Sequence, residues 1–503
     1  MKYGFLFGAG AEIAYNLPSG GRFALDIFRQ DTAFPKQKFK NMRDAVEPTT
    51  AYATEWLPRG YKDKNIGTFG KSVFQNIIMS TVEHRRGEIV KRINDFDAIS
   101  ISIAKKMEKS GENVNDAFLE LLGKDITNIR LSNVISYNDA FKKGNELFES
   151  NYFSGLLTVY KDSPDKKEHQ ALGRILLSIM QLQLGALSED LSRNINDNLF
   201  EKKDDTIDLF DDFGELIQLN YNAAGVSGLE YLLEPHEMDC STSYGIILTF
   251  AQQLMEEIYS SVLDYKSLID SNWHYLYNPA SDWAKFCKIS IFLLTVHKYI
   301  TDLGDKADKL NPDGYYNMLR SALNAGKYEA STIATTNYNK LIADILGNDY
   351  EITYLNGSVA VWYDPYLNKV GSERELDNDE HHIIVPLLFT QSGTKPMTSI
   401  SMSKKYVDMY MDWRASDAVV VVGFGFGADD EHINGILRTL VNDDEKELYV
   451  VTLNRGLDES NEARQIARRL KVRDYNKIKV LLVDKQGKID GVNWTERLEG
   501  EEL

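Results

Sequence analysis

The chain opens on Lys2-Tyr3-Gly4-Phe5-Leu6-Phe7-Gly8-Ala9-Gly10-Ala11-Glu12, a short apolar and aromatic run that passes directly into a Gly-x-Gly turn. This pattern predicts a buried strand over 2–7, followed by a turn and the start of a helix. Such a turn presents free backbone N–H groups at a positive helix end, and glycine lets a pyrophosphate approach closely. The turn therefore indicates a nucleotide site, although a tight turn without a ligand uses the same residues. The third glycine of the dehydrogenase fingerprint, expected near Ala11 or Ile13, is missing.

Short apolar runs return in the last third of the chain. They are rich in β-branched residues and bounded by turn residues, which is typical of the buried strands of a parallel sheet with helices on both faces. We expect the first strand and these runs to complete one Rossmann-like parallel sheet in an α/β domain. The predicted strands lie at 332–335, 350–355, 383–389, 418–422, 449–453 and 479–483.

The region between these two parts has a helical period. Apolar residues recur at three- and four-residue spacing over 166–191, 244–268 and 282–303. We interpret this region as a large all-helical insertion, because a domain inserted into a loop is tolerated when its ends lie close together. The predicted organisation is the first part of the Rossmann-like domain over residues 1–60, the helical insertion over 61–327 and the remainder of the Rossmann-like domain over 328–503.

The composition restricts the kinds of partner. A formal net charge of −18 over 503 residues argues against a general binder of nucleic acids or anionic membranes. No apolar run approaches the ~20 residues that a membrane helix requires. The two cysteines, Cys240 and Cys287, lie in unlike contexts, which favours a cytoplasmic protein without disulfides. No spacing indicates a metal site, and the pair His381-His382 is expected to be structural or solvated.

Three later motifs accompany the glycine turn and Leu17-Pro18. They are Thr335-Thr336-Asn337-Tyr338-Asn339, Tyr354-Leu355-Asn356-Gly357-Ser358 and the valine-rich segment 415–426. In their order and residue types these motifs resemble the sirtuin-like (SIR2) NAD-binding family. The resemblance covers about the first sixty residues and the last third of the chain. It implies a Rossmann-like domain that binds NAD⁺ across the carboxyl ends of its strands.

The resemblance also implies which residues form the site. The glycine turn would take the pyrophosphate, Glu12 would face a ribose hydroxyl or cap a helix, and Asn337 would face the nicotinamide ribose. Asn337 directly follows a predicted strand, where open α/β sheets bind ligands, although a turn or capping role is the alternative. The expected catalytic residues are Asn337 and Asn356. The expected cofactor-binding residues are Gly8, Ala9, Gly10, Glu12, Pro18, Thr336, Asn339, Gly423, Phe424, Gly425 and Asn454.

Two positions depart from the family's pattern. The acidic residue that ends the Asn motif is Asn339 here, and the histidine that serves as general base is replaced by Asn356. An amide cannot accept a proton at neutral pH, so neither position supplies a base. Nicotinamide nevertheless leaves as a neutral molecule, so positioning and electrostatics can supply much of the acceleration. These residues are compatible with three alternatives. The protein is a slow hydrolase without a base, it uses a base from elsewhere in the chain, for which His432 is a candidate, or it has lost its base and its activity.

The function implied by the resemblance is hydrolysis of NAD⁺ to ADP-ribose and nicotinamide by a regulated anti-phage defence effector that depletes NAD⁺. The insertion would then carry contacts to a homo-oligomer, a partner protein or a phage-derived activator. The alternative is a catalytically impaired SIR2-like module that binds NAD⁺ or an ADP-ribose derivative as a structural or signalling ligand within a defence complex. A protein deacylase is disfavoured, because two cysteines cannot build the four-cysteine zinc site of those enzymes.

Overall fold

The computed structural model describes residues 1–17, 20–130, 146–163, 169–186, 206–208, 218–220, 226–234, 240–260, 265–347, 349–377, 379–388, 399–427, 430–454 and 456–499. The chain divides into two compact units. Unit 1 consists of Met1–Ser19, Gln30–Phe69 and Lys266–Leu503, and unit 2 consists of Gly20–Arg29 and Gly70–Tyr265.

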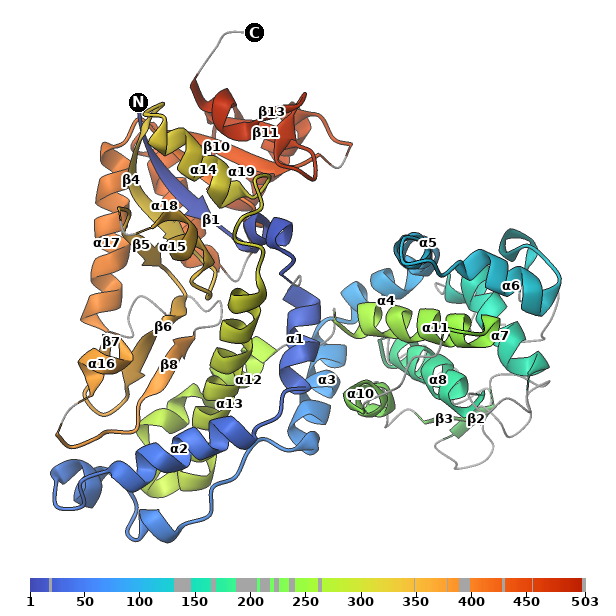
Figure 1. Ribbon diagram of the computed structural model, residues 1–503, viewed down its shortest axis with the longest axis horizontal. Helices are drawn as coiled ribbons and strands as arrows, with labels where there is room; N and C mark the ends of the chain where they lie inside the picture. The colour runs from blue at the N-terminus through green and yellow to red at the C-terminus, as the bar shows by residue number, and fades with distance from the viewer. Residues whose placement is uncertain are drawn as a thin grey trace. The chain divides into compact units, whose positions relative to one another are not determined.

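Unit 1 is built on a six-stranded parallel sheet (Figure 1). The strands pair in the order β11-β10-β9-β1-β4-β5. Counted from β5 and numbered by their place in the chain, they follow 3-2-1-4-5-6, the order of the Rossmann fold. The predicted α/β class with a Rossmann-like parallel sheet is therefore confirmed. The strands are β1 (Lys2–Phe7), β4 (Glu329–Thr335), β5 (Ile352–Tyr354), β9 (Ala418–Val422), β10 (Glu447–Leu453) and β11 (Ile478–Val483).

Helices bury the sheet on its faces because the strands carry apolar side chains on both sides. Phe5 and Phe7 of β1 are fully buried in one cluster with α14 (Tyr315–Asn324) and α15 (Leu341–Leu346). Trp413 of α17 (Ile400–Ala415) lies so close to Gly4 that a Cβ there would be 2.2 Å from the indole ring. Further α-helices and short strands of unit 1 are α2 (Ala33–Ala45), α13 (Pro279–Lys306), α16 (Glu373–Leu376), α18 (Glu431–Asn442), α19 (Glu459–Leu470), β12 (Lys488–Ile489) and β13 (Val492–Asn493).

A second sheet in unit 1 corrects one of the predicted strands. Residues 383–389 were expected in the main sheet, but β8 (Val385–Leu388) pairs antiparallel with β6 (Gly357–Asp364). β7 (Lys369–Gly371) pairs with β6 on its other edge. The reason is local, because Gly357 has φ +80° and turns the chain from β5 directly into β6. The segment containing β8 therefore has an antiparallel partner before the chain returns to the main sheet at β9.

Within its described residues, unit 2 is helical except for an antiparallel pair of short strands, β2 (Thr206–Asp208) and β3 (Gln218–Asn220), so the expected all-helical insertion is wrong in this detail. The helix α11 (Ser243–Ser260) packs against α1, α5, α6 and α8 through a buried apolar face. The other helices are α1 (Gly20–Phe28), α3 (Lys71–His84), α4 (Arg86–Asn94), α5 (Phe96–Glu108), α6 (Val114–Leu122), α7 (Asn151–Asp162), α8 (His169–Ala186) and α10 (Val226–Leu233), with α12 (Tyr265–Asn272) at the boundary of the units.

The boundaries of the units differ from those expected at residues 60 and 327. Residues 266–327 belong to unit 1, because α13 packs on α2 and on β8, and α14 covers the main sheet. The short segment Gly20–Arg29 belongs to unit 2, because α1 packs against α11. Within the described residues, no helix is both long and apolar enough to cross a membrane.

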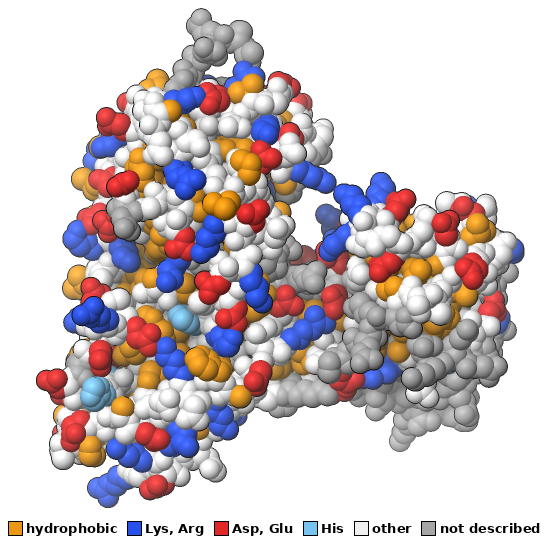
Figure 2. Space-filling view, in the orientation of Figure 1, with side chains coloured by type: hydrophobic (Ala, Val, Ile, Leu, Met, Phe, Trp, Pro, Cys, Tyr) orange, Lys and Arg blue, Asp and Glu red, His pale blue; other side chains and the backbone are white. Residues whose placement is uncertain are grey.

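Surface ion pairs contribute little to the stability of unit 1. Figure 2 shows acidic and basic side chains interspersed over the face that it draws. Exposed pairs such as Lys471–Glu431, with 2.9 Å between Nζ and Oε1, typically contribute ~0–1 kcal/mol each.

Candidate functional site

The carboxyl ends of four neighbouring strands bring the predicted motifs together. Phe7 at the end of β1 lies opposite Thr335 of β4 and Val422 of β9, and Thr335 lies opposite Tyr354 of β5. The residues that follow these strands therefore share one edge of the sheet. The connections on the two sides of β1 run in opposite directions, and ligands of such sheets bind at this switch point.

The glycine turn leads into a short 3₁₀ helix, η1 (Ala9–Tyr15), rather than a long α-helix. The backbone N–H groups of this turn are expected to be free for a ligand, but three of them donate to backbone oxygens of the protein. Gly8 N donates to Val422 O at 2.9 Å, Gly10 N donates to Gly423 O at 2.9 Å, and Ala11 N donates to Gly8 O at 3.0 Å. These three donors bind the protein itself, so in this structure they are not available to a phosphate. Ala9 is exposed.

Close packing accounts for the glycines of the two turns. A Cβ on Gly8 would lie 2.6 Å from Gly423 O, and one on Gly10 would lie 2.9 Å from Gly423 Cα. Gly423 itself has φ +63°, a conformation that a residue with a side chain adopts only with strain. The turns after β1 and β9 are thus in backbone contact, which leaves no room for side chains between them.

Asn337 connects the glycine turn to the Asn motif. Its side chain is 7% exposed, and its Nδ2 donates to Gly8 O and to the hydroxyl of Tyr316, both at 3.1 Å. Because the Gly8 carbonyl can only accept, Nδ2 must face it, which fixes the orientation of the amide. Within the described residues no hydrogen bond uses Asn337 Oδ1. This oxygen can accept a hydrogen bond from a ligand hydroxyl.

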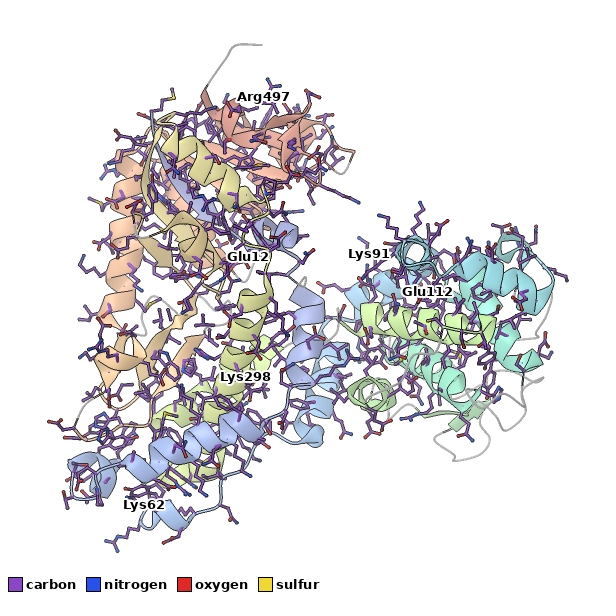
Figure 3. The ribbon with its side chains drawn as sticks, viewed as in Figure 1. Glu12, Lys62, Lys91, Glu112, Lys298 and Arg497 are labelled. Atoms are coloured by element: carbon purple, nitrogen blue, oxygen red, sulfur yellow. The ribbon has the colours of Figure 1, made fainter. Side chains whose placement is uncertain are left out.

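Glu12, which is labelled in Figure 3, is a buried carboxylate of η1. It is 6% exposed, its Oε1 accepts from the Tyr316 hydroxyl at 3.0 Å, and its Oε2 accepts from Asn339 Nδ2 at 2.6 Å. Burial raises the pKa of Glu12 to about 7, although hydrogen bonds from Asn339, Tyr316 and Asn337 act to lower it. A carboxyl group with this pKa changes its charge near neutral pH.

Tyr316 is a member of the site that the sequence motifs did not identify. Its ring stacks on that of Tyr15 with centroids 5.4 Å apart, and the Tyr15 hydroxyl accepts from Tyr316 N at 2.9 Å. Tyr15 in turn donates to Asn317 Oδ1 at 2.9 Å. These contacts hold the Tyr316 hydroxyl between Glu12 and Asn337. Tyr316 lies in α14 within the predicted insertion, and no local pattern distinguishes it from a core tyrosine.

The amides Asn339 and Asn356 are both engaged by the protein. Asn339 Oδ1 accepts from Leu341 N at 2.9 Å near the start of α15, while its Nδ2 binds Glu12. Asn356 is 1% exposed, and its Nδ2 donates to Thr336 O at 3.2 Å. Asn356 thereby supports the loop that carries Asn337. Thr336, which is also buried, donates from N to Phe7 O at 3.0 Å.

The other predicted ligand residues lie around this cluster. Phe424 is buried and packs edge-to-face on Phe426 at 5.2 Å, while Gly425 is exposed. Asn454 is exposed at the end of β10, and its Oδ1 accepts from Gly456 N at 2.9 Å, as in an ordinary Asx turn. Pro18 lies outside the described residues. The reserve base, His432, has its ring against that of Tyr406, with centroids 5.8 Å apart.

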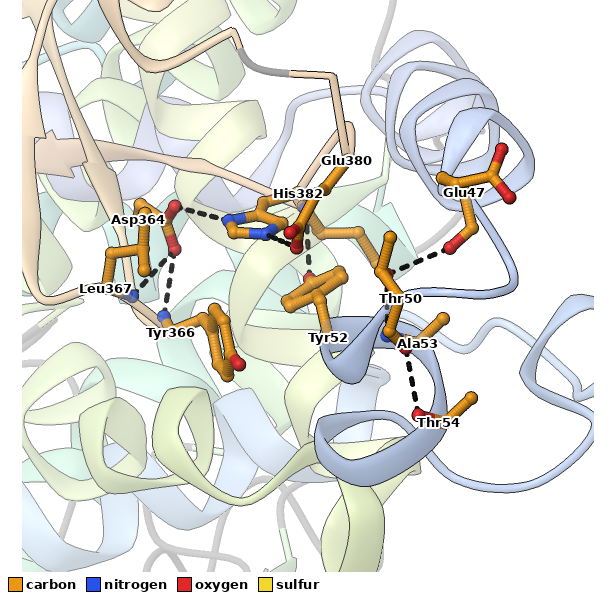
Figure 4. Close-up of polar contacts among 11 residues, drawn as sticks. Glu47, Thr50, Tyr52, Ala53, Thr54, Asp364, Tyr366, Leu367, Glu380 and His382 are labelled. Atoms are coloured by element: carbon orange, nitrogen blue, oxygen red, sulfur yellow. Dashed lines mark hydrogen bonds and ion pairs between the residues drawn. The ribbon is translucent and has the colours of Figure 1, made fainter.

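His382 occupies a separate buried cluster, as Figure 4 shows. Its Nδ1 lies 2.7 Å from Asp364 Oδ2, its Nε2 lies 2.9 Å from Glu380 Oε2, and its ring stacks on Tyr52. Burial acts to lower the pKa of His382, but the two carboxylates outweigh it and raise the pKa above its ordinary value. Asp364 is fully buried and also accepts from Tyr366 N. This cluster joins the second sheet to the helical turn at Tyr52 and fits the structural role expected for this histidine.

Comparisons with protein-family models, curated proteins and solved structures found no match to this chain. The candidate site is therefore defined by its own contacts. These bring together Gly8, Glu12, Asn337 and Asn339 in one hydrogen-bonded cluster, with Asn356 supporting it from beneath the Asn337 loop.

Proposed function

We propose that unit 1 is an NAD⁺ hydrolase that converts NAD⁺ to ADP-ribose and nicotinamide, as its resemblance to the SIR2-like family implies. The observation that carries this proposal is the hydrogen bond from Asn337 Nδ2 to Gly8 O at 3.1 Å. It joins the turn expected to face the pyrophosphate to the amide expected to face the ribose. The Rossmann strand order supports the same placement, because dinucleotides bind at the switch point beside β1.

In the proposed reaction Asn337 positions the ribose. The two hydrogen bonds that Nδ2 donates fix the orientation of the amide. Its Oδ1 can then accept a hydrogen bond from a ribose hydroxyl, and this bond orients C1′ for the departure of nicotinamide. The C1′–N bond breaks with its electron pair on nicotinamide, which leaves as a neutral molecule. Water then forms the C1′–O bond and releases a proton to the solvent. The cationic character that develops on the ribose calls for a negative charge rather than for a general acid.

The proposed biological role is a regulated effector of anti-phage defence. A protein that depletes NAD⁺ has to stay inactive until it is triggered, and unit 2 offers a second compact body for that control. Contacts to further copies of the chain, to a partner protein or to a phage-derived activator are proposed for it. These assignments rest on the family resemblance alone.

The second candidate is a module that binds NAD⁺ or an ADP-ribose derivative without cleaving it. The observation that favours it concerns the two amides that depart from the family's pattern. Both form hydrogen bonds within the protein, since Asn356 donates to Thr336 O and Asn339 donates to Glu12. The internal bonds of Gly8 N and Gly10 N point the same way. In this case Asn356→His, which retains a donor for the Thr336 carbonyl and adds a base, would be expected to initiate cleavage.

The deciding experiment measures NAD⁺ binding and NAD⁺ consumption by the full-length protein, alone and with extract from phage-infected cells. Asn337→Ala is the test variant, and Asn476→Ala, which alters an exposed amide in the 3₁₀ helix η13 (Tyr475–Lys477) of the same unit, is the matched control. Consumption that is lost only in Asn337→Ala supports the hydrolase. Binding without consumption, in every condition, supports the binding module.

A further inference from the structure

Glu12 lies in a hydrogen-bond network in which each of its carboxylate oxygens accepts from a side-chain donor. The Tyr316 hydroxyl has one hydrogen, and its oxygen accepts from Asn337 Nδ2, so the hydrogen is free to go to Glu12 Oε1. Asn339 offers Nδ2 to Oε2, because its own Oδ1 is occupied by Leu341 N. Both carboxylate oxygens therefore receive donors.

A proton on Glu12 would disturb this arrangement at either oxygen. On Oε2 it would oppose the N–H of Asn339, and on Oε1 it would displace the hydrogen of Tyr316. A displaced Tyr316 hydroxyl no longer has its acceptor, and the bond that orients Asn337 weakens. The hydrogen-bonding pattern thus fits the ionised carboxylate, while burial favours the protonated one.

The other titratable groups around Glu12 do not change their charge near neutral pH. Burial raises the pKa values of Tyr15, Tyr316 and Tyr354 above the ordinary value of 10, so these phenols stay neutral. The charge of Arg320 acts to lower the pKa of Tyr15, and the charge of Asp344 acts to raise the pKa of Tyr354. The group whose charge changes within this cluster is Glu12.

We propose that ionised Glu12 supports the ribose site without acting as a base: it positions Asn337 through the Tyr316 hydroxyl, and its charge stabilises the cation that develops on the ribose. This inference rests on the proposed NAD⁺ site. Glu12 does not take the proton of the attacking water in this scheme, and it is ionised before and after the reaction. Its contribution is a fixed negative charge in a water-poor environment, where such a charge acts strongly.

The test compares Glu12→Gln, Tyr316→Phe and the control Glu459→Gln in the full-length protein between pH 5.5 and 9. Glu12→Gln keeps the shape of the side chain without the charge, Tyr316→Phe removes only the connecting hydroxyl, and Glu459 is an exposed acid in the first turn of α19. Thermal melts establish that each variant is folded. The rate of NAD⁺ hydrolysis and the dissociation constant of NAD⁺ are measured on the same samples.

We expect the wild-type rate to rise with pH about a midpoint near 7. In Glu12→Gln the rate should fall by roughly 10²-fold and lose this rise, with a much smaller change in the dissociation constant, because the charge acts mainly on the transition state. Tyr316→Phe should lower the rate less and shift the midpoint. A Glu12→Gln variant with the wild-type rate and pH profile would overturn the inference while leaving the hydrolase intact.

If the wild-type protein binds NAD⁺ without cleaving it, the proposed hydrolase fails and binding becomes the readout. Ionised Glu12 then predicts that the dissociation constant of the wild type decreases as the pH rises through 7, and that it is independent of pH in Glu12→Gln. Identical pH dependence in the two proteins would overturn the role of Glu12. A wild type that binds no NAD⁺ at all overturns both proposals.

Discussion

Asn337 Nδ2 donates to the carbonyl oxygen of Gly8 at 3.1 Å, although the two residues lie 329 positions apart in the chain. This bond joins the turn after β1 to the turn after β4. It makes Asn337 a part of the fold as well as the residue proposed to position the ribose. Substitutions in the cluster are therefore expected to change stability as well as function.

Asn337→Asp tests the structural part of this role. The aspartate would place an acceptor opposite Gly8 O and add a negative charge beside Glu12. We expect unit 1 to lose roughly 1–3 kcal/mol of stability, because buried acceptors are left without donors. All six tryptophans of the chain lie in unit 1, so their fluorescence during urea unfolding reports on this unit. Asn476→Asp is the control, and equal stability of both variants would contradict the expectation.

Glu12→Gln should change the pH dependence of stability in a defined direction. The pKa of Glu12 is raised from 4.5 to about 7 in the fold, so stability is full below pH 4.5 and is lost as the pH rises through 7. The loss amounts to about 3 kcal/mol, since one pKa unit corresponds to ~1.4 kcal/mol. The glutamine cannot ionise, so its stability relative to the wild type should improve between pH 5 and pH 8. A difference that stays constant with pH would show that Glu12 does not titrate in this way.

His382 provides an independent pH dependence. Its pKa is raised in the fold, so the stability that it contributes is full below its ordinary pKa of 6.5 and is lost as the pH rises through the raised value. The neutral ring cannot donate to both Asp364 and Glu380, whereas the protonated ring can. We expect His382→Gln to reduce stability at pH 5.5 by ~1–3 kcal/mol and much less at pH 9. His381→Gln, at an exposed position, is the control.

Gly8→Ala should destabilise unit 1 before any ligand is added. The new Cβ would lie 2.6 Å from Gly423 O and 2.7 Å from Phe424 Cα, both of them backbone atoms. Backbone movement of this kind typically costs about 1–3 kcal/mol. Gly425→Ala is a matched control, because a Cβ there meets no atom within 4 Å. Equal urea midpoints for the two variants would contradict the close contact of the turns.

The strands of the main sheet could be predicted because their apolar runs are local and continuous. Segment 418–422 coincides with β9, and the turn after β1 was located from its glycines alone. The reason for those glycines could not be predicted, because their contacts with Gly423 join residues more than 400 positions apart. The sequence indicates that these glycines make room for a phosphate, whereas the structure shows that they also allow close packing of two turns.

The remaining errors concern contacts between distant segments. Residues 383–389 have the composition of a parallel strand, and only their pairing with β6 assigns them to another sheet. Tyr316 resembles many core tyrosines, and its role depends on the packing of α14 over η1. Glu12 was expected near a ribose hydroxyl or a helix end. Its burial and its contact with Asn339 become visible only in the folded chain.

The most direct measurement quantifies ADP-ribose and nicotinamide released from NAD⁺ by the wild type and by Asn337→Ala, with and without extract from phage-infected cells. Our account predicts equimolar release of both products by the wild type and at least a 10²-fold lower rate in the variant. Equal release by both proteins would place the chemistry away from Asn337. No release by the wild type in either condition would contradict the proposed hydrolase.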